Sequence, residues 1–231
     1  ALASDGWSVP SDTLRGGHRS GRAATLVPRQ RSRSSRMGTM SDYYDYAPQV
    51  DLTESIVVSG YLSDFTRSVT YRASSHLGLA YHDIDRLVEH EAGMEIGQLI
   101  LEEGEAAYRA VESHCLARTL GQQPFGLVAL GDGGLLRSGN RDQVEKQGHL
   151  VVLDFELANL FWRVQKIARR LEPARWHPLF DGPPDELAQL KPFYQERKET
   201  FGKARITIDS NALNTSTACQ ALMDCITTAP R

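Results

Sequence analysis

Five short apolar runs alternate with helical patterns, and this alternation constrains the fold more than any other feature of the chain. The runs are SIVVSG, LAYHDID, FGLVAL, HLVVLDF and ARITIDS, which begin at Ser55, Leu79, Phe125, His149 and Ala204. Nearly continuous apolar runs are typical of strands that are buried on both faces. Helices between successive strands supply the long crossovers that parallel strands need. The sequence therefore predicts an α/β fold, with a five-stranded parallel sheet covered by helices on both faces.

The segments between the apolar runs carry the period of amphipathic helices. In residues 66–77, Val69, Ala73 and Leu77 recur at four-residue spacing and mark one helical face. A loop is expected where EPARWHPLFDGPP brings prolines and a glycine together. Further helical segments are expected at 84–93, 94–104, 105–121, 141–148, 156–171, 185–190, 192–202 and 215–226.

The first fifty residues differ in composition from the rest of the chain. Residues 1–40 contain seven arginines, no lysine and two acids, so their charge is +5 and the remainder carries −8 of the total of −3. Such a polar segment cannot bury a core. We expect a disordered Arg/Ser-rich leader over residues 1–50 and one domain over residues 51–231. A transit peptide, a nucleic-acid-binding arm, and a solvated or wrongly assigned extension preceding Met37 or Met40 all fit the leader.

Cysteine usage and hydropathy disfavour several classes of protein. Cys115, Cys219 and Cys225 form no C-x-x-C pair, so we expect neither a disulfide framework nor a zinc site, and a reducing compartment fits best. No run of eighteen apolar residues occurs, so no membrane span is expected. We expect a location in the cytoplasm or in an organelle stroma or matrix, with no membrane partner and no nucleic-acid partner.

A specific pattern of spaced residues begins at the second predicted strand. In YHDIDRLVEHEAGMEIGQLILEEGEAAYRAVE, an acid-x-acid pair precedes Gly-x-x-Ile and then Gly-Glu-x-x-aromatic-Arg-x-x-Glu. The residues at these positions are Asp83, Asp85, Gly93, Ile96, Gly104, Glu105, Tyr108, Arg109 and Glu112. This order of motifs resembles the shikimate kinase family over roughly residues 54–227. The resemblance implies a three-layer P-loop kinase fold with a lid.

The resemblance implies roles for three of these side chains. Asp83 matches the family position near the magnesium ion, and Asp85 the one that accepts hydrogen bonds from shikimate hydroxyls. Arg109 matches the guanidinium that binds the shikimate carboxylate, for which a planar fork is suited. From the residues alone, a helix-capping acid and a surface ion pair would explain the same side chains.

The segment ALGDGG resembles the family's Ala-Thr-Gly-Gly-Gly segment. Gly131 and Gly133 match the first and third glycines, and Asp132 replaces the middle one. Glycines let backbone N–H groups approach a ligand closely, so the resemblance implies that Gly131 and Gly133 contact substrate. The charge of Asp132 would oppose a nearby carboxylate or phosphate. An ordinary strand-to-helix turn is the alternative interpretation.

The stretch after the first strand departs from the family's G-x-x-x-x-G-K-[ST] loop. Aligned on Gly60, the second glycine becomes Phe65, the lysine Thr66 and the hydroxyl residue Arg67. The loop thus loses a flexible pivot, the cation that bridges the phosphates and a magnesium ligand. If the loop is one residue longer, Arg67 and Ser68 could stand for Lys-Ser. The candidate nucleotide-binding residues are therefore Gly60, Arg67 and Ser68.

Two later motifs also depart from the family pattern. The Arg-x-Pro-x-Tyr motif, whose arginine binds the shikimate carboxylate, keeps its proline and tyrosine but has Leu190 for the arginine, and neither Lys191 nor Arg197 is in register to replace it. The lid's Arg-Pro-Leu becomes His-Pro-Leu at residues 177–179. The candidates for the lid cation that reaches the transferred phosphate are Lys166, Arg169 and Arg170.

These departures predict a shikimate-kinase-like protein with absent or much reduced phosphotransfer from ATP. It would act as a ligand-binding or regulatory pseudokinase, with a shikimate-like small molecule or a protein as its partner. The first alternative is an active shikimate kinase with a divergent loop, which would use ATP and Mg²⁺ to make shikimate 3-phosphate; otherwise no cofactor is certain. The second alternative is an interaction module in a larger protein, because fold does not fix function.

Overall fold

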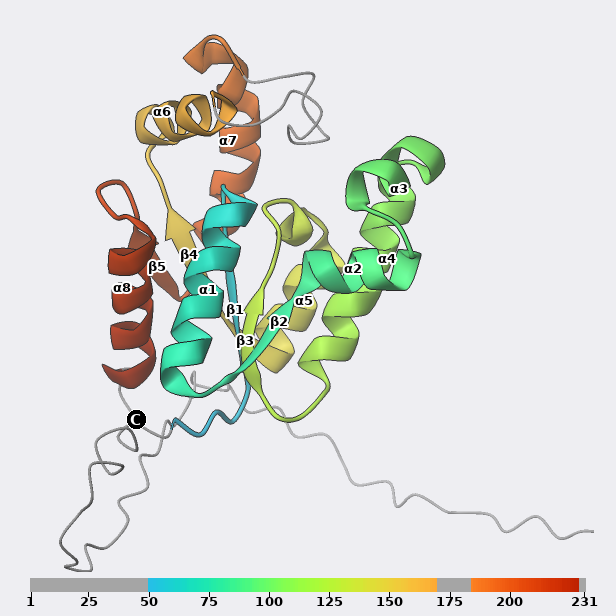
Figure 1. Cartoon of the computed structure of the whole chain (residues 1–231), viewed down its shortest axis with the longest axis vertical. Coiled ribbons are helices and arrows are strands. Elements are labelled where there is room, and N and C mark those ends of the chain that lie inside the picture. The colour runs from blue at the N-terminus through green and yellow to red at the C-terminus, as the bar shows by residue number, and fades with distance from the viewer. Residues whose placement is uncertain (1–49, 170–183, 229–231) are drawn as a thin grey trace, which may run out of the picture.

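The computed structural model describes residues 50–169 and 184–228, which form a parallel sheet with helices on both faces (Figure 1). The strands are β1 (Ser55–Gly60), β2 (Ala80–Asp83), β3 (Gly126–Ala129), β4 (Gly148–Asp154) and β5 (Ile206–Asp209). They pair in parallel in the order β2-β3-β1-β4-β5. The predicted five-stranded α/β sheet is confirmed. The predicted leader lies outside the described residues, apart from Val50.

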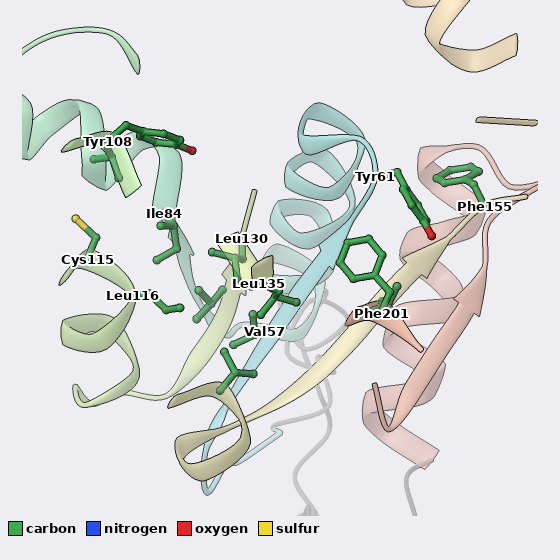
Figure 2. Close-up of a cluster of buried hydrophobic side chains, with 14 of the residues drawn as sticks. Val57, Tyr61, Ile84, Tyr108, Cys115, Leu116, Leu130, Leu135, Phe155 and Phe201 are labelled. Atoms are coloured by element: carbon green, nitrogen blue, oxygen red, sulfur yellow. The ribbon is translucent and has the colours of Figure 1, made fainter. Parts of the chain in front are cut away.

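The central strand β1 shows why the apolar runs are continuous. Ile56 and Val58 pack into one core with helices α1 (Ser63–Leu77) and α8 (Thr215–Thr228). Val57 packs into a second core on the opposite face, with residues of α4 (Glu105–Leu120) and α5 (Ser138–Gln147) (Figure 2). Because side chains alternate along a strand and both faces are covered, every residue of β1 is buried.

The remaining helices extend the two ends of the sheet. Helices α2 (Ile84–Ala92) and α3 (Ile96–Glu103) pack with α4, and α6 (Leu157–Ala168) packs with α7 (Leu187–Phe201). The short 3₁₀ helix η2 (Gly134–Leu136) follows β3. No helix within residues 50–169 and 184–228 is long and apolar enough to span a bilayer.

The two helical segments expected on either side of Pro192 form the single helix α7. Its start is fixed by a capping box, in which the Glu186 side chain accepts from the Gln189 backbone and the Gln189 side chain accepts from the Glu186 backbone. Pro192 lies inside the helix, and its exposed position keeps the ring away from the core. The helix therefore continues through a residue that usually ends one, because Tyr194 and Phe201 bury its inner face.

Helix α1 begins at Ser63, three residues before the start predicted from its apolar face. Only Tyr61 and Leu62 separate it from β1. Tyr61 is buried, stacks on Tyr194 with 5.0 Å between ring centroids, and meets the edge of Phe201 at 4.9 Å. The chain is thus drawn into the apolar core immediately after the strand, and the expected loop is replaced by the first turn of a helix.

Candidate functional site

The carboxyl ends of β1, β2 and β3 bring most of the predicted site residues to one edge of the sheet. Asp83 ends β2 and lies in register with Ala129 at the end of β3. The Ser59 hydroxyl, near the end of β1, donates to the carbonyl of Gly131 at 3.4 Å. Ligands of open parallel sheets bind at this edge. The candidate site is therefore where the topology predicts it.

The turn after β1 leads directly into a helix. Thr66, at the lysine position of the family loop, is 1% exposed, and its N–H donates to the carbonyl of Leu62 at 2.9 Å within α1. A nest requires successive N–H groups that point at a ligand, and this one is used inside the helix. Gly60 has a different reason to be glycine, because a Cβ there would lie 2.8 Å from the carbonyl oxygen of Leu153.

Phe65, at the position of the loop's second glycine, is half-buried against the apolar cores. Its ring meets the edge of the Phe155 ring with 5.6 Å between centroids. The Arg163 guanidinium lies 5.1 Å from the Phe65 ring centroid. Phe65 contacts both apolar cores, so this position holds an aromatic side chain where the family leaves space for phosphate.

Arg67 is directed at the carboxylate that the resemblance assigns to magnesium. Its Nε lies 3.8 Å from Asp83 Oδ2, and its terminal nitrogen lies 2.7 Å from Asp64 Oδ1. Burial alone would lower the pKa of Arg67, but the neighbouring Asp83 and Asp64 carboxylates raise it above its ordinary value. Ser68 is exposed on α1. Arg67 is thus paired with two carboxylates of this chain.

The surroundings of Asp83 do not fit Mg²⁺. In addition to Arg67, the Arg86 guanidinium lies 3.7 Å from Asp83 Oδ2, and the Tyr81 hydroxyl donates to the same oxygen at 3.3 Å. Two guanidinium groups at this distance would repel a divalent cation. Within the described part of the chain, no cluster of three or more His, Cys, Asp or Glu side chains could hold a metal ion.

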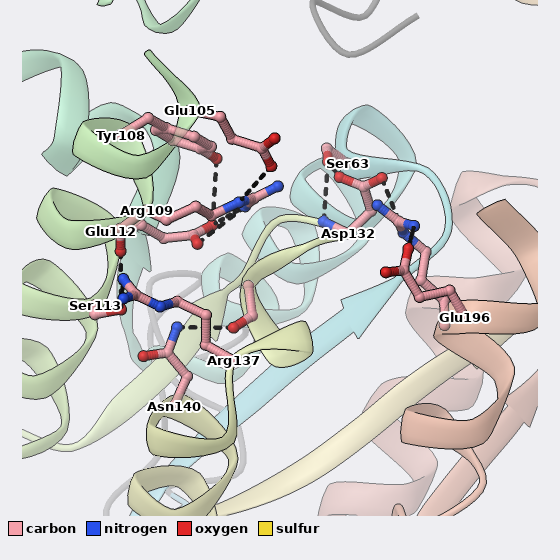
Figure 3. Close-up of polar contacts among 12 residues, drawn as sticks. Ser63, Glu105, Tyr108, Arg109, Glu112, Ser113, Asp132, Arg137, Asn140 and Glu196 are labelled. Atoms are coloured by element: carbon pink, nitrogen blue, oxygen red, sulfur yellow. Dashed lines mark hydrogen bonds and ion pairs between the residues drawn. The ribbon is translucent and has the colours of Figure 1, made fainter. Parts of the chain in front are cut away.

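Arg109, the predicted carboxylate-binding residue, is engaged by acids of its own helix (Figure 3). One terminal nitrogen donates to both carboxylate oxygens of Glu112 at 3.0 Å, and Nε donates to Glu105 at 3.3 Å. Glu112 is 0% exposed and also accepts from the Tyr108 hydroxyl at 3.2 Å. Burial would lower the pKa of Arg109, but Glu112 raises it overall. The guanidinium charge is therefore largely balanced within α4.

Asp85 is the least satisfied acid of the site. Its Oδ1 is buried and makes no hydrogen bond to any of the residues that the structure describes. A Cβ placed on Gly131 would lie 3.0 Å from this oxygen, so the glycine gives Asp85 its room. Burial, reinforced by the charges of Asp83 and Glu112, raises the pKa of Asp85 to about 7. Near neutral pH this carboxyl can accept a hydrogen bond or donate one.

Asp132 makes contacts that join three segments far apart in the sequence. Its N–H donates to the Ser63 hydroxyl at 3.3 Å, and that hydroxyl donates to Asp132 Oδ1 at 3.4 Å. Its other oxygen lies 3.3 Å from Nε of Arg197 on α7. Sequence reasoning considered Arg197 only as a stand-in at the Leu190 position and missed this pair. The signal was present, because an acid in place of a buried glycine requires a partner.

Most of the remaining predicted residues lie away from this edge or outside the described residues, and Gly133 is the exception. Leu190 is buried in the apolar core rather than directed at a ligand. Lys166 and Arg169 are exposed at the end of α6. Arg170 and residues 177–179 lie outside the described residues. Gly133 lies against Arg109, since a Cβ on it would be 2.8 Å from Cζ of that guanidinium.

Solved structures of shikimate kinases share this architecture. The enzyme from Bacteroides thetaiotaomicron is similar with a TM-score of 0.63 and 20% identity, over 75% of this chain and 98% of that one. The enzyme from Acinetobacter baumannii, solved in complex with shikimate, has a TM-score of 0.61 and 21% identity, over 77% and 95%. At these identities the likeness shows the fold, which is the α/β P-loop kinase fold.

Sequence comparison identifies the family. The chain is 30% identical over 164 residues to a shikimate kinase from Symbiobacterium thermophilum, which covers 69% of this chain and 89% of the relative. A shikimate kinase from Thermobifida fusca is 34% identical over 140 residues, 60% and 74% of the two chains. The shikimate kinase family model matches residues 67–227. The chain therefore belongs to the shikimate kinase family.

Proposed function

We propose that this protein is a pseudokinase of the shikimate kinase family, which binds a small hydroxylated ligand but transfers phosphate from ATP slowly or not at all. The observation that carries the proposal is the start of α1 at Ser63, two residues after β1. A helix at this position uses the backbone N–H of Thr66 internally and leaves no loop to surround phosphates.

The charges of the site support the same proposal. The resemblance assigns phosphate or carboxylate binding to Arg67 and Arg109, and both are paired with acids of this chain. Removing one preorganised charge-stabilising donor from a transition state costs about 2.7–4 kcal/mol. Loss of the lysine and of the nest, together with the placing of Asp83 beside two guanidinium groups, would leave little phosphoryl transfer. The match to the family model also begins only at Arg67, after this turn.

Asp85 supports the ligand-binding part of the proposal. Its buried Oδ1 makes no hydrogen bond to the described residues and lies beside Gly131. A ligand hydroxyl is the group that such an oxygen can pair with at neutral pH. A relative in the family has been solved in complex with shikimate, so a shikimate-like polyol is the ligand class we propose.

Calorimetric titration and a coupled ADP-release assay test the proposal. The full chain is titrated with ATP and Mg²⁺ and with shikimate, and the shikimate kinase of Symbiobacterium thermophilum serves as the positive control. We expect no saturable heat with the nucleotide and no shikimate-dependent ADP release. A polyol titration that is saturable for the wild type and lost in Asp85→Asn supports ligand binding.

An active enzyme with a divergent loop is the competing function, since Asp83, Asp85 and Arg109 keep the family spacing. It predicts ADP release that depends on shikimate, saturates with ATP and falls in Asp85→Asn. That result would overturn the proposal. Asp142→Asn, a change at an exposed acid on α5, is the control for a loss of charge elsewhere.

A further inference from the structure

A buried ion pair connects α7 to the segment after β3. The carboxylate of Asp132 lies 3.3 Å from Nε of Arg197, and the two side chains are 7% and 4% exposed. A pair this enclosed has lost most of its hydration, so each charge depends on the other. In Figure 3, Asp132 lies between the cluster of Arg109, Glu105 and Glu112 on one side and Glu196 of α7 on the other.

The position around Asp132 has the components of an oxyanion site. Arg197 supplies a cation whose face stacks on the Phe193 ring, 3.5 Å from its centroid. Ser63 supplies a hydroxyl at 3.4 Å on the other carboxylate oxygen. Glu196 and the carbonyl of Phe193 approach a terminal nitrogen of Arg197 at 3.2 and 3.3 Å, not its Nε. A cation and a hydroxyl therefore converge on a single carboxylate, which this chain supplies itself.

We propose that the Asp132 carboxylate is a permanent internal occupant of a small-oxyanion position formed by Arg197 and Ser63. Its presence keeps external carboxylates and phosphates away from Arg197, and it fixes α7 to the start of α1 without any ligand. Removing the carboxylate should therefore create a site for a small oxyanion such as formate or inorganic phosphate. This inference depends only on these contacts and does not require that the protein lack phosphotransfer.

Thermal denaturation of the full chain with added anions tests the inference. The variants are Asp132→Ala, Arg197→Met and Asp132→Ala/Arg197→Met, with Asp142→Ala as the control for loss of an exposed acid. Each is melted in sodium chloride, sodium formate and sodium phosphate at matched ionic strength. The midpoint Tm is followed as formate or phosphate replaces chloride.

We expect Asp132→Ala to lower Tm by roughly 10 °C, because Arg197 then stays buried with only the exposed carboxylate of Glu196 to balance its charge. Formate or phosphate should restore much of that loss in a saturable manner. The wild type, Asp142→Ala and the double variant should show no such response. Rescue by formate alone indicates a position that fits only a planar carboxylate, and rescue by both anions indicates one that also takes a tetrahedral ion.

Two outcomes would overturn the inference. One is an Asp132→Ala protein that does not respond to either anion, whatever its Tm. The other is an anion response that persists in the double variant, which would place the bound anion away from Arg197. If Asp132→Ala does not fold, Asp132→Asn replaces it. A double variant, Asp132→Asn/Arg197→Met, that melts at a higher temperature than Asp132→Asn supports the ion pair. Losses of Tm that simply add in the double variant contradict it.

Discussion

The turn after β1 and the region between β2 and α4 lie at the same edge of the sheet, but they differ from the family pattern in different ways. In the turn, Phe65 and Thr66 do not match the family motif; Thr66 is buried, and Phe65 is half-buried against the apolar cores. Between β2 and α4, Asp85 and Arg109 keep the family spacing, yet Arg109 is held by Glu112. A retained residue type therefore does not by itself establish a retained role, because the partners of a side chain influence what it can bind.

The largest expected effect comes from separating Arg109 from Glu112. Arg109→Met leaves a carboxylate that is 0% exposed without its cation, so we expect the free energy of unfolding to fall by about 3–5 kcal/mol. Urea denaturation followed by circular dichroism measures it. Adding Glu112→Gln to the variant should recover part of the loss, since the uncompensated charge is then removed.

Arg86→Met is the matched control for this prediction. Arg86 lies 3.7 Å from Asp83, but its side chain is 76% exposed. Exposed ion pairs contribute at most about 1 kcal/mol, so this variant should unfold close to the wild type. Equal losses in the two variants would show that Arg109 is not a structural residue, and would return it to the role of a ligand-binding arginine.

The turn after β1 is tested by truncating its aromatic residue. Phe65→Ala removes the ring that packs against Phe155 and both cores, so we expect a loss of about 2–3 kcal/mol in unfolding free energy. Leu101→Ala, at a side chain that is 87% exposed, should change it by less than about 0.5 kcal/mol. A similarly small effect at Phe65 would mean that the turn is a free loop with space for a ligand.

The same contrast explains what could be predicted from the sequence. The sheet and its helices follow from local periodicity, as the burial of Val69, Ala73 and Leu77 shows. The departures from the family loop at Phe65 and Thr66 could also be predicted from the sequence, because the motif specifies a glycine and a lysine at these positions. The early start of α1 could not be predicted from the sequence, because it depends on the packing of Tyr61 against residues that lie far along the chain.

Ion pairs between residues far apart in the sequence could not be predicted from periodicity or motifs. Asp132 and Arg197 are 65 residues apart in the numbering, and only the fold brings α7 against the segment after β3. Arg109 and Glu112 are three residues apart on one helix, a spacing that favours contact. Their pairing could have been predicted, but the family pattern directed attention to an external carboxylate instead.

The pH dependence of stability tests the environment of Asp85, an acid that keeps its position in the family pattern. Burial raises the pKa of Asp85 to about 7 in the folded state, above its ordinary value. Between about pH 4 and 7 the folded protein therefore holds a proton that the unfolded chain has released, and Asp85 makes stability fall as pH rises through this window. Asp85→Asn removes this dependence.

We expect the unfolding free energy of Asp85→Asn, relative to the wild type, to rise by on the order of 1–3 kcal/mol between about pH 4 and 8. Urea denaturation at several pH values measures this difference. Asp142→Asn, at an exposed acid, should give a flat difference over the same range. A flat difference for Asp85→Asn as well would mean that its carboxyl is ionised throughout, with a partner or water that the contacts do not show.

The smallest expected effect tests how closely the segment after β3 is fitted to Arg109. A Cβ at Gly133 would lie 2.8 Å from Cζ of Arg109, and Glu112 keeps this guanidinium from moving aside. Gly133→Ala should therefore cost about 1–2 kcal/mol of unfolding free energy, through overpacking. Gly139→Ala, on α5 with nothing within 4 Å of its Cβ position, should instead gain about 0.5 kcal/mol from helix propensity. If both substitutions stabilise the protein, Arg109 can leave its acid partner at little cost, and the region between β2 and α4 would retain an arginine that a ligand carboxylate could recruit.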